Sequence, residues 1–178
     1  GLEELHIRKP SWDAGMLRSY ISKIPSQYHS RLVLHSHVPA LAPEFNLKRL
    51  HFTEKEREGM SPFELELLRE KKFRLSTSVH SVPELDACRP FFQRIFLGPV
   101  FNSISKKGYK GKPFPMFPKD PSCEVIGIGG VKNSNIATLK ELGYDGGAML
   151  GWIWEDPSQA LTRFMTVQKK WALQDQLH

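Results

Sequence analysis

Short apolar segments recur along the chain and alternate with segments of helical pattern. No two-residue hairpin turn joins one apolar segment to the next, so the strands that they predict must be linked by longer crossovers. Crossover connections place neighbouring strands parallel to one another. We predict seven strands, over residues 2–8, 31–35, 48–52, 73–80, 93–97, 124–128 and 146–150.

Helical periodicity and end signals predict four of the connecting helices. The helix at 63–72 reads "FELELLREKK" after a Ser-Pro pair that suits an N-cap and a first helical position. The other three are predicted over residues 13–23, 135–142 and 156–172. Residues 107–122 hold four prolines and two glycines, so they predict a loop, with a surface excursion favoured over a lid.

An eight-stranded α/β barrel that lacks its first strand and helix would give this count of strands. An open, doubly wound sheet would carry a glycine-rich nucleotide loop after its first strand, and none follows residues 2–8. We therefore predict the α/β class and a (β/α)8 TIM barrel without its first βα unit, formed by residues 1–178 as a single domain. The uncovered strand edges predict a homodimer or aggregation.

Composition excludes several classes of protein. The 178 residues are 40% hydrophobic with a net charge of +6, and no apolar run approaches the ~20 residues of a membrane span. We expect a cytoplasmic protein with no membrane partner. Basic residues are scattered except near 106–112, which favours a small anionic ligand over a nucleic acid. Cys88 and Cys123 have no metal-site spacing, and we predict two buried free thiols.

Two strand ends carry polar side chains in alternation with apolar ones. In "LHIRKP", His6 and Arg8 share one face, which in a barrel would point inward at the carboxyl end. A salt bridge is the structural alternative for Arg8. In "RLVLHSH", His35 and His37 lie on the face opposite Leu34. They could bind a metal ion, although we favour polar filling of the barrel mouth.

The strand that ends in "STSVHS" has a polar face. Side chains alternate along a strand, so Ser76, Ser78 and His80 point one way and Thr77 and Val79 the other. A strand with such a face lines either an active site or a hydrogen-bonded core.

Two kinds of loop suit the oxygens of a phosphate. Ser103, Ser105 and Lys106 offer two hydroxyls and an ammonium group within four residues. The stretches "IGIGGV" and "YDGGAMLGWIW" each run from an apolar strand into glycine, which lets a phosphate approach the backbone N–H groups. The loops after the last two strands form the recurrent phosphate site of eight-stranded barrels. Tight turns alone would be the other reason for these glycines.

Taken in order, "LHIRKP", "SVHS", "LGPVFNSISK", "IGIGGV" and "GYDGGAMLG" resemble the thiamine phosphate synthase and TenI superfamily along nearly the whole chain. The resemblance implies a (β/α)8 barrel and an enzyme of thiamine biosynthesis that binds a small phosphorylated thiazole. It further implies a diphosphate or phosphate loop, a backbone cradle for the thiazole phosphate, and a matching arginine at a strand end. These residues are Ser103, Ser105 and Lys106 for the loop, Gly130, Leu150 and Gly151 for the cradle, and Arg8.

The sequence departs from the synthases where they hold magnesium. His35 and Ser36 stand at the place of an Asn-Asp pair, and Glu56 is the remaining acidic candidate for a metal ligand. Pro10 replaces a lysine of the family pattern. Magnesium prefers oxygen ligands, so these changes argue against magnesium-diphosphate chemistry.

"SVHS" resembles the stretch of TenI-type thiazole tautomerases whose histidine moves a proton on the substrate. The resemblance implies that His80 is the catalytic acid and base, with Ser78 beside it in the substrate site. We therefore expect a thiazole tautomerase without a cofactor. The alternatives are a magnesium-dependent thiamine phosphate synthase and a non-catalytic regulatory barrel that binds thiazole phosphate.

Overall fold

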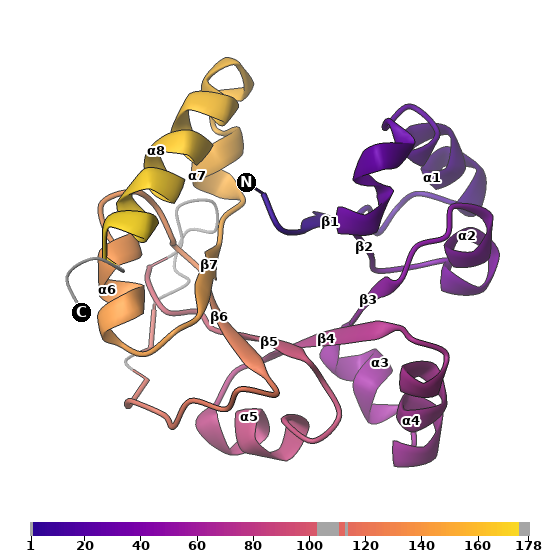
Figure 1. The fold of residues 1–178 in the computed structure, drawn as a ribbon, viewed down its shortest axis with the longest axis horizontal. Coiled ribbons are helices and arrows are strands. Elements are labelled where there is room, and N and C mark those ends of the chain that lie inside the picture. Colours follow the sequence, from indigo (N-terminus) through magenta and orange to yellow (C-terminus); the bar gives the residue numbers. More distant parts are fainter. Residues whose placement is uncertain (1, 103–110, 113, 175–178) are drawn as a thin grey trace. The chain divides into compact units, whose positions relative to one another are not determined.

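The computed structural model describes residues 2–102, 111–112 and 114–174 (Figure 1). The chain divides into two compact units, Gly1–Thr77 and Ser78–His178. Among the described residues, no helix has the length and apolar character that crossing a bilayer requires.

All seven predicted strands are confirmed. Within each unit, neighbouring strands pair in parallel and follow chain order. Parallel strands joined by helical crossovers give an α/β, TIM-barrel-like arrangement. The strands are β1 (Leu5–Ile7), β2 (Leu32–Leu34), β3 (Arg49–Phe52), β4 (Arg74–Val79), β5 (Arg94–Leu97), β6 (Glu124–Ile128) and β7 (Gly146–Ala148).

Helices connect these strands, and the four helices predicted from the sequence are confirmed as α1, α4, α6 and α8. Four further α-helices, α2, α3, α5 and α7, were not predicted. The α-helices are α1 (Ala14–Ile21), α2 (Val38–Glu44), α3 (Glu54–Glu58), α4 (Pro62–Glu70), α5 (Val82–Cys88), α6 (Ile136–Glu141), α7 (Gly151–Trp154) and α8 (Ala160–Gln174). Two 3-10 helices are η1 (Ser26–Arg31) and η2 (Pro157–Gln159).

The register of the first unit aligns polar side chains on one face of its sheet. His6 is the partner of Val33 across β1 and β2, and His51 is the partner of Ser76 across β3 and β4. Paired residues in a parallel sheet point to the same side. The opposite face carries leucines such as Leu34 and Leu50, which are buried to 1% exposure or less.

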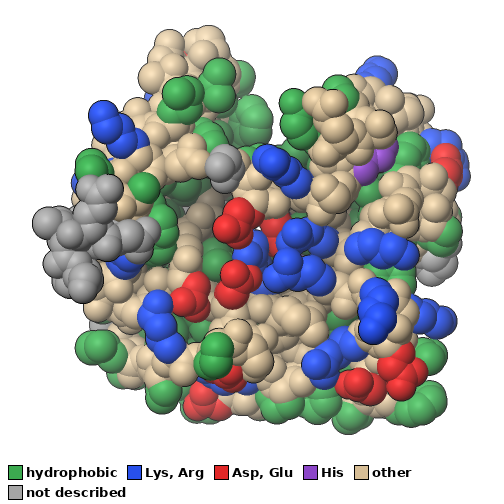
Figure 2. Space-filling model, viewed as in Figure 1, with side chains coloured by type: hydrophobic (Ala, Val, Ile, Leu, Met, Phe, Trp, Pro, Cys, Tyr) green, Lys and Arg blue, Asp and Glu red, His purple; other side chains and the backbone are tan. Residues whose placement is uncertain are grey.

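Charged residues on α3 and α4 belong to capping boxes and to the solvent-facing surface. Thr53 caps α3 together with Glu56, and Ser61 caps α4 together with Glu64. On the face drawn in Figure 2, Lys and Arg side chains over these helices are interleaved with Asp and Glu. That mixture is typical of a solvated surface.

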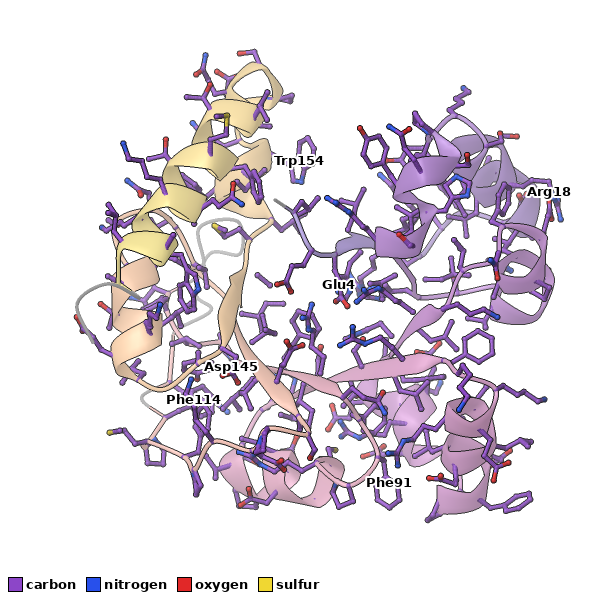
Figure 3. All side chains as sticks on the ribbon, in the orientation of Figure 1. Glu4, Arg18, Phe91, Phe114, Asp145 and Trp154 are labelled. Carbon is purple, nitrogen blue, oxygen red and sulfur yellow. The ribbon has the colours of Figure 1, made fainter. Side chains whose placement is uncertain are left out.

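Asp145 (labelled in Figure 3) makes stabilising contacts just before β7 in the second unit. One carboxylate oxygen accepts a hydrogen bond from the backbone N–H of Val125 at 2.9 Å, and the other lies 3.0 Å from Nζ of Lys119. These contacts tie β7 to β6 and to the segment before β6. The described residues between 111 and 122 form no helix, as their prolines predict.

The two cysteines are buried free thiols, as predicted. Burial raises the pKa of the Cys123 thiol to about 11, so it stays protonated and unreactive at neutral pH.

Candidate functional site

His80 follows directly after β4, and its imidazole has a fixed orientation. Its Nδ1 lies 2.8 Å from the carbonyl oxygen of Gly98, the residue that follows β5. A carbonyl oxygen only accepts hydrogen bonds, so Nδ1 carries the proton and Nε2 is the unprotonated nitrogen of the neutral ring. The backbone N–H of His80 donates to the Glu84 carboxylate at 3.1 Å. The residue is exposed, so it is not a core histidine.

The polar face of β4 divides into two parts along the strand. Ser78 is half-buried, next to the exposed His80. Ser76 is buried, and its hydroxyl donates to the carbonyl of Leu50 at 3.0 Å. Ser76 therefore belongs to a hydrogen-bonded interior, whereas the end of the strand reaches solvent.

The loops after β6 and β7 start from matched positions. Ile128 is the register partner of Ala148, so Gly130 and Leu150 each lie two residues beyond the last pair. Gly130 has a φ of +64°, and a Cβ there would lie 2.3 Å from the carbonyl oxygen of Asn102. The position thus requires glycine both for its backbone conformation and for the close approach of the neighbouring loop.

The loop after β7 leads straight into α7, which begins at Gly151. Leu150 precedes the helix and is 73% exposed. The first N–H groups of a helix have no partner within it, so the backbone of this turn offers donors to solvent or to an anion. Arg163 holds the turn by donating to the carbonyl of Trp152 and to the carboxylate of Glu155.

The remaining residues predicted for the site have three different outcomes. Arg8 is exposed and makes no hydrogen bond or ion pair with the described residues, so the salt-bridge alternative is not observed. Glu56 caps α3: its carboxylate accepts from the backbone N–H and the hydroxyl of Thr53, at 2.8 and 2.7 Å. The predicted diphosphate loop lies outside the described residues; it comprises Ser103, Ser105 and Lys106.

Three histidines meet in the first unit, and the sequence did not predict their association. His6 Nδ1 lies 3.0 Å from His35 Nε2, and the ring centroids of His35 and His51 are 4.3 Å apart. One nitrogen of each ring lies within 4.8 Å of the others, which is a spacing that could hold a metal ion. His37, the predicted partner of His35, instead donates through Nε2 to the carbonyl of Trp12.

The histidine cluster contains two imidazoles that stay neutral over a wide pH range. Burial, with a smaller contribution from neighbouring cationic groups, lowers the pKa of His35 to about 3. The same causes lower the pKa of His51 to about 2. Both rings are therefore uncharged near neutral pH.

This cluster predicts a loss of stability in mild acid. An unfolded histidine titrates near pH 6.5, so the unfolded chain binds protons below that pH that His35 and His51 in the folded chain do not accept. The free energy of unfolding should fall by about 2 kcal/mol for each of these histidines between about pH 7 and pH 5. Urea unfolding at both pH values, in chelator-containing buffer, measures this fall in the free energy of unfolding. A His35→Gln variant should show a smaller fall than the wild type. An equal fall in this variant would contradict the assignment.

No protein-family model matches the sequence, and no curated protein matches it. Solved structures do match. A thiamine phosphate pyrophosphorylase from Bacteroides thetaiotaomicron superposes with a TM-score of 0.70 at 24% identity, covering 95% of this chain and 84% of that chain. A thiamine phosphate pyrophosphorylase from Pyrococcus furiosus superposes with a TM-score of 0.72 at 14% identity, covering 98% of this chain and 85% of that chain.

At 24% and 14% identity, these two matches show that the chain shares the fold of the two solved structures. The likeness extends over nearly the whole chain, so it is not confined to one or two βα units. The resemblance seen in the sequence motifs is thereby confirmed at the level of architecture. The chain has the α/β, TIM-barrel-like fold of thiamine phosphate pyrophosphorylases.

Proposed function

We propose that this chain is an enzyme of the thiamine phosphate synthase and TenI superfamily that binds a phosphorylated thiazole. Within the superfamily we assign it the activity of a thiazole tautomerase, in which His80 moves a proton on the substrate. The observation that carries the assignment is the hydrogen bond from His80 Nδ1 to the Gly98 carbonyl.

That hydrogen bond prepares His80 for proton transfer. Because Nδ1 donates its proton to the Gly98 carbonyl, Nε2 is unprotonated. It can accept a proton from one substrate atom and return it to another. Tautomerisation needs no more than this, because a proton leaves one position and a proton arrives at another. The exposure of the residue gives a substrate access to it.

For the phosphate of the substrate we propose a binding corner in the same unit, formed by the loops after β6 and β7. The loops at Gly130 and at Leu150 both begin two residues past the last register pair of β6 and β7. Backbone N–H groups in a glycine turn and in the first turn of α7 suit phosphate oxygens, which accept several hydrogen bonds.

A magnesium-dependent synthase is the second candidate, and the fold match to pyrophosphorylases is what favours it. The donors present in the described residues do not fit magnesium. The carboxylate of Glu56 is engaged in the capping box of α3. The group of potential metal ligands found among the described residues consists of three imidazoles, those of His6, His35 and His51. Magnesium prefers oxygen ligands to imidazoles. We therefore place the tautomerase first and the non-catalytic binder third.

Amide chemical shifts test the binding corner directly. Thiazole phosphate should shift the amide protons of Gly130, Leu150 and Gly151 downfield, since each N–H would gain a charge-assisted hydrogen bond. Inorganic phosphate should produce the same shifts at higher concentration, because it fills only part of the site. Saturable shifts confined to other amides would contradict the proposed corner.

A further inference from the structure

We propose that His6, His35 and His51 form a binding site for a divalent transition-metal ion, with Zn²⁺ as its expected occupant. The three residues come from β1, from the end of β2 and from β3, all within the first unit. It shares no residue with the proposed proton-transfer and phosphate sites, and the proposal does not depend on the proposed function.

The hydrogen bond of His6 sets which of its nitrogens faces the cluster. Its Nε2 lies 3.3 Å from a carboxylate oxygen of Glu4 (labelled in Figure 3), and a carboxylate only accepts. Nε2 therefore carries the proton, and Nδ1 presents its lone pair to His35 at 3.0 Å. Glu4 is itself held by Arg49. A carboxylate that orients a histidine from behind is the usual support of a metal ligand.

His51 is oriented in the same way by a hydroxyl group. Ser76 donates its proton to the carbonyl of Leu50 at 3.0 Å, so its oxygen is left to accept from His51 Nδ1, also at 3.0 Å. The proton of the ring is thus on Nδ1, and Nε2 is the unprotonated nitrogen. Two rings with independent partners are therefore both fixed in the tautomer that metal binding needs.

His35 completes the set. Its ring contacts both other rings, at centroid distances of 5.2 Å to His6 and 4.3 Å to His51. Its Nδ1 is buried and has no hydrogen-bond partner in the described structure. Buried polar atoms are nearly always satisfied, so this nitrogen suits a hydrogen-bonding water and not the cation itself. Because His6 Nδ1 accepts, His35 Nε2 carries the proton in the ion-free protein. A cation would replace that proton at Nε2, and the ring proton would then occupy Nδ1.

The chemistry of the donors selects the metal. Three imidazoles without a thiolate or carboxylate suit Zn²⁺ and its neighbours in the first transition row. With Zn–N distances of about 2.0–2.1 Å, tetrahedral geometry brings ligand nitrogens to roughly 3.4 Å from one another. The present separations, 3.0 Å between His6 Nδ1 and His35 Nε2 and up to 4.8 Å within the cluster, lie on either side of this value, so small shifts of the rings would complete the geometry. Three protein ligands leave one coordination position for water or an anion.

Metal binding to the full chain tests the proposal without any activity assay. The chelator-treated protein should bind one Zn²⁺ in competition with a chromophoric chelator. Co²⁺ at the same site should give the strong visible absorption of four-coordinate cobalt. His51→Gln should abolish both signals, and Glu4→Gln should weaken affinity by about 10–100-fold, since it removes the negative charge that supports His6.

His37→Asn is the matched control, because it removes a histidine two residues from His35 at a backbone φ of 54° that asparagine tolerates. It should bind Zn²⁺ like the wild type. Should His51→Gln fail to fold, the wild-type cobalt spectrum and the Glu4→Gln affinity still decide. Wild-type protein that binds less than one Zn²⁺, or a His37→Asn loss equal to that of Glu4→Gln, would overturn the site.

Discussion

Asparagine in place of His80 is expected to lower the tautomerisation rate by about 10²–10⁴-fold, the usual contribution of one general acid or base. Affinity for thiazole phosphate should change little, because the phosphate corner that we propose does not include His80. Asparagine keeps an N–H that can donate to the Gly98 carbonyl, so the local structure is retained. It has no group that exchanges a proton near neutral pH.

Steady-state kinetics with a separate binding measurement check this separation. A fall in kcat at nearly constant Kd shows that His80 acts in the chemical step. His37→Asn, which makes the same replacement at an exposed histidine of the first unit, should retain full activity. An unchanged kcat in His80→Asn, or an equal loss of binding and rate, would contradict the role of His80.

Alanine in place of Gly98 is expected to destabilise the fold by about 3 kcal/mol or more, the range for severe overpacking at a buried site. Its Cβ would lie 2.2 Å from the carbonyl oxygen of Ile128 and 2.7 Å from the side chain of the same residue. The Ile128 carbonyl cannot move away freely, because it accepts a hydrogen bond from the N–H of Val100 at 2.9 Å. Any shift of Gly98 would also move the carbonyl that orients His80.

Urea unfolding measures the stability loss, and Gly59→Ala is its control. A Cβ at Gly59 would meet the Glu56 carbonyl oxygen at 3.5 Å, an ordinary contact, at a φ of −80° that alanine adopts readily. Its free energy of unfolding should change by about 0.5 kcal/mol or less. A Gly98→Ala variant as stable as Gly59→Ala would show that the close packing of Gly98 against Ile128 is not required.

The strands were predictable because each one is a short segment with apolar residues, either consecutive or alternating with polar ones, bounded by polar or turn residues. The unpredicted helices have seven residues or fewer, too short for a helical period to show in the sequence. Among them, α3 reads "EKERE" and has no apolar residue, so its clearest signal is its capping box. That box has a sequence signature, Thr53 followed three residues later by Glu56, which could have been recognised. The same applies to α5, where Ser81 caps the helix and Glu84 follows three residues later.

The candidate site was predictable only where a single strand carries it. Alternation placed His6 on the polar face of its strand, and the motif at residues 76–81 singled out His80. The meeting of His6, His35 and His51 depends on the register of three strands, and a sequence without hairpins does not fix that register. Glu56 was predicted as a metal ligand because an acidic residue after a strand suits that role too, although the capping-box signature with Thr53 indicated the cap.

We expect this chain to transfer a proton on a phosphorylated thiazole and not to displace diphosphate. Both reactions can be followed on one preparation of the whole chain, in buffer with Mg²⁺ and in buffer from which Mg²⁺ is omitted. Tautomerisation should continue at an undiminished rate without Mg²⁺. Formation of thiamine phosphate that requires Mg²⁺, with no tautomerisation under either condition, would contradict it.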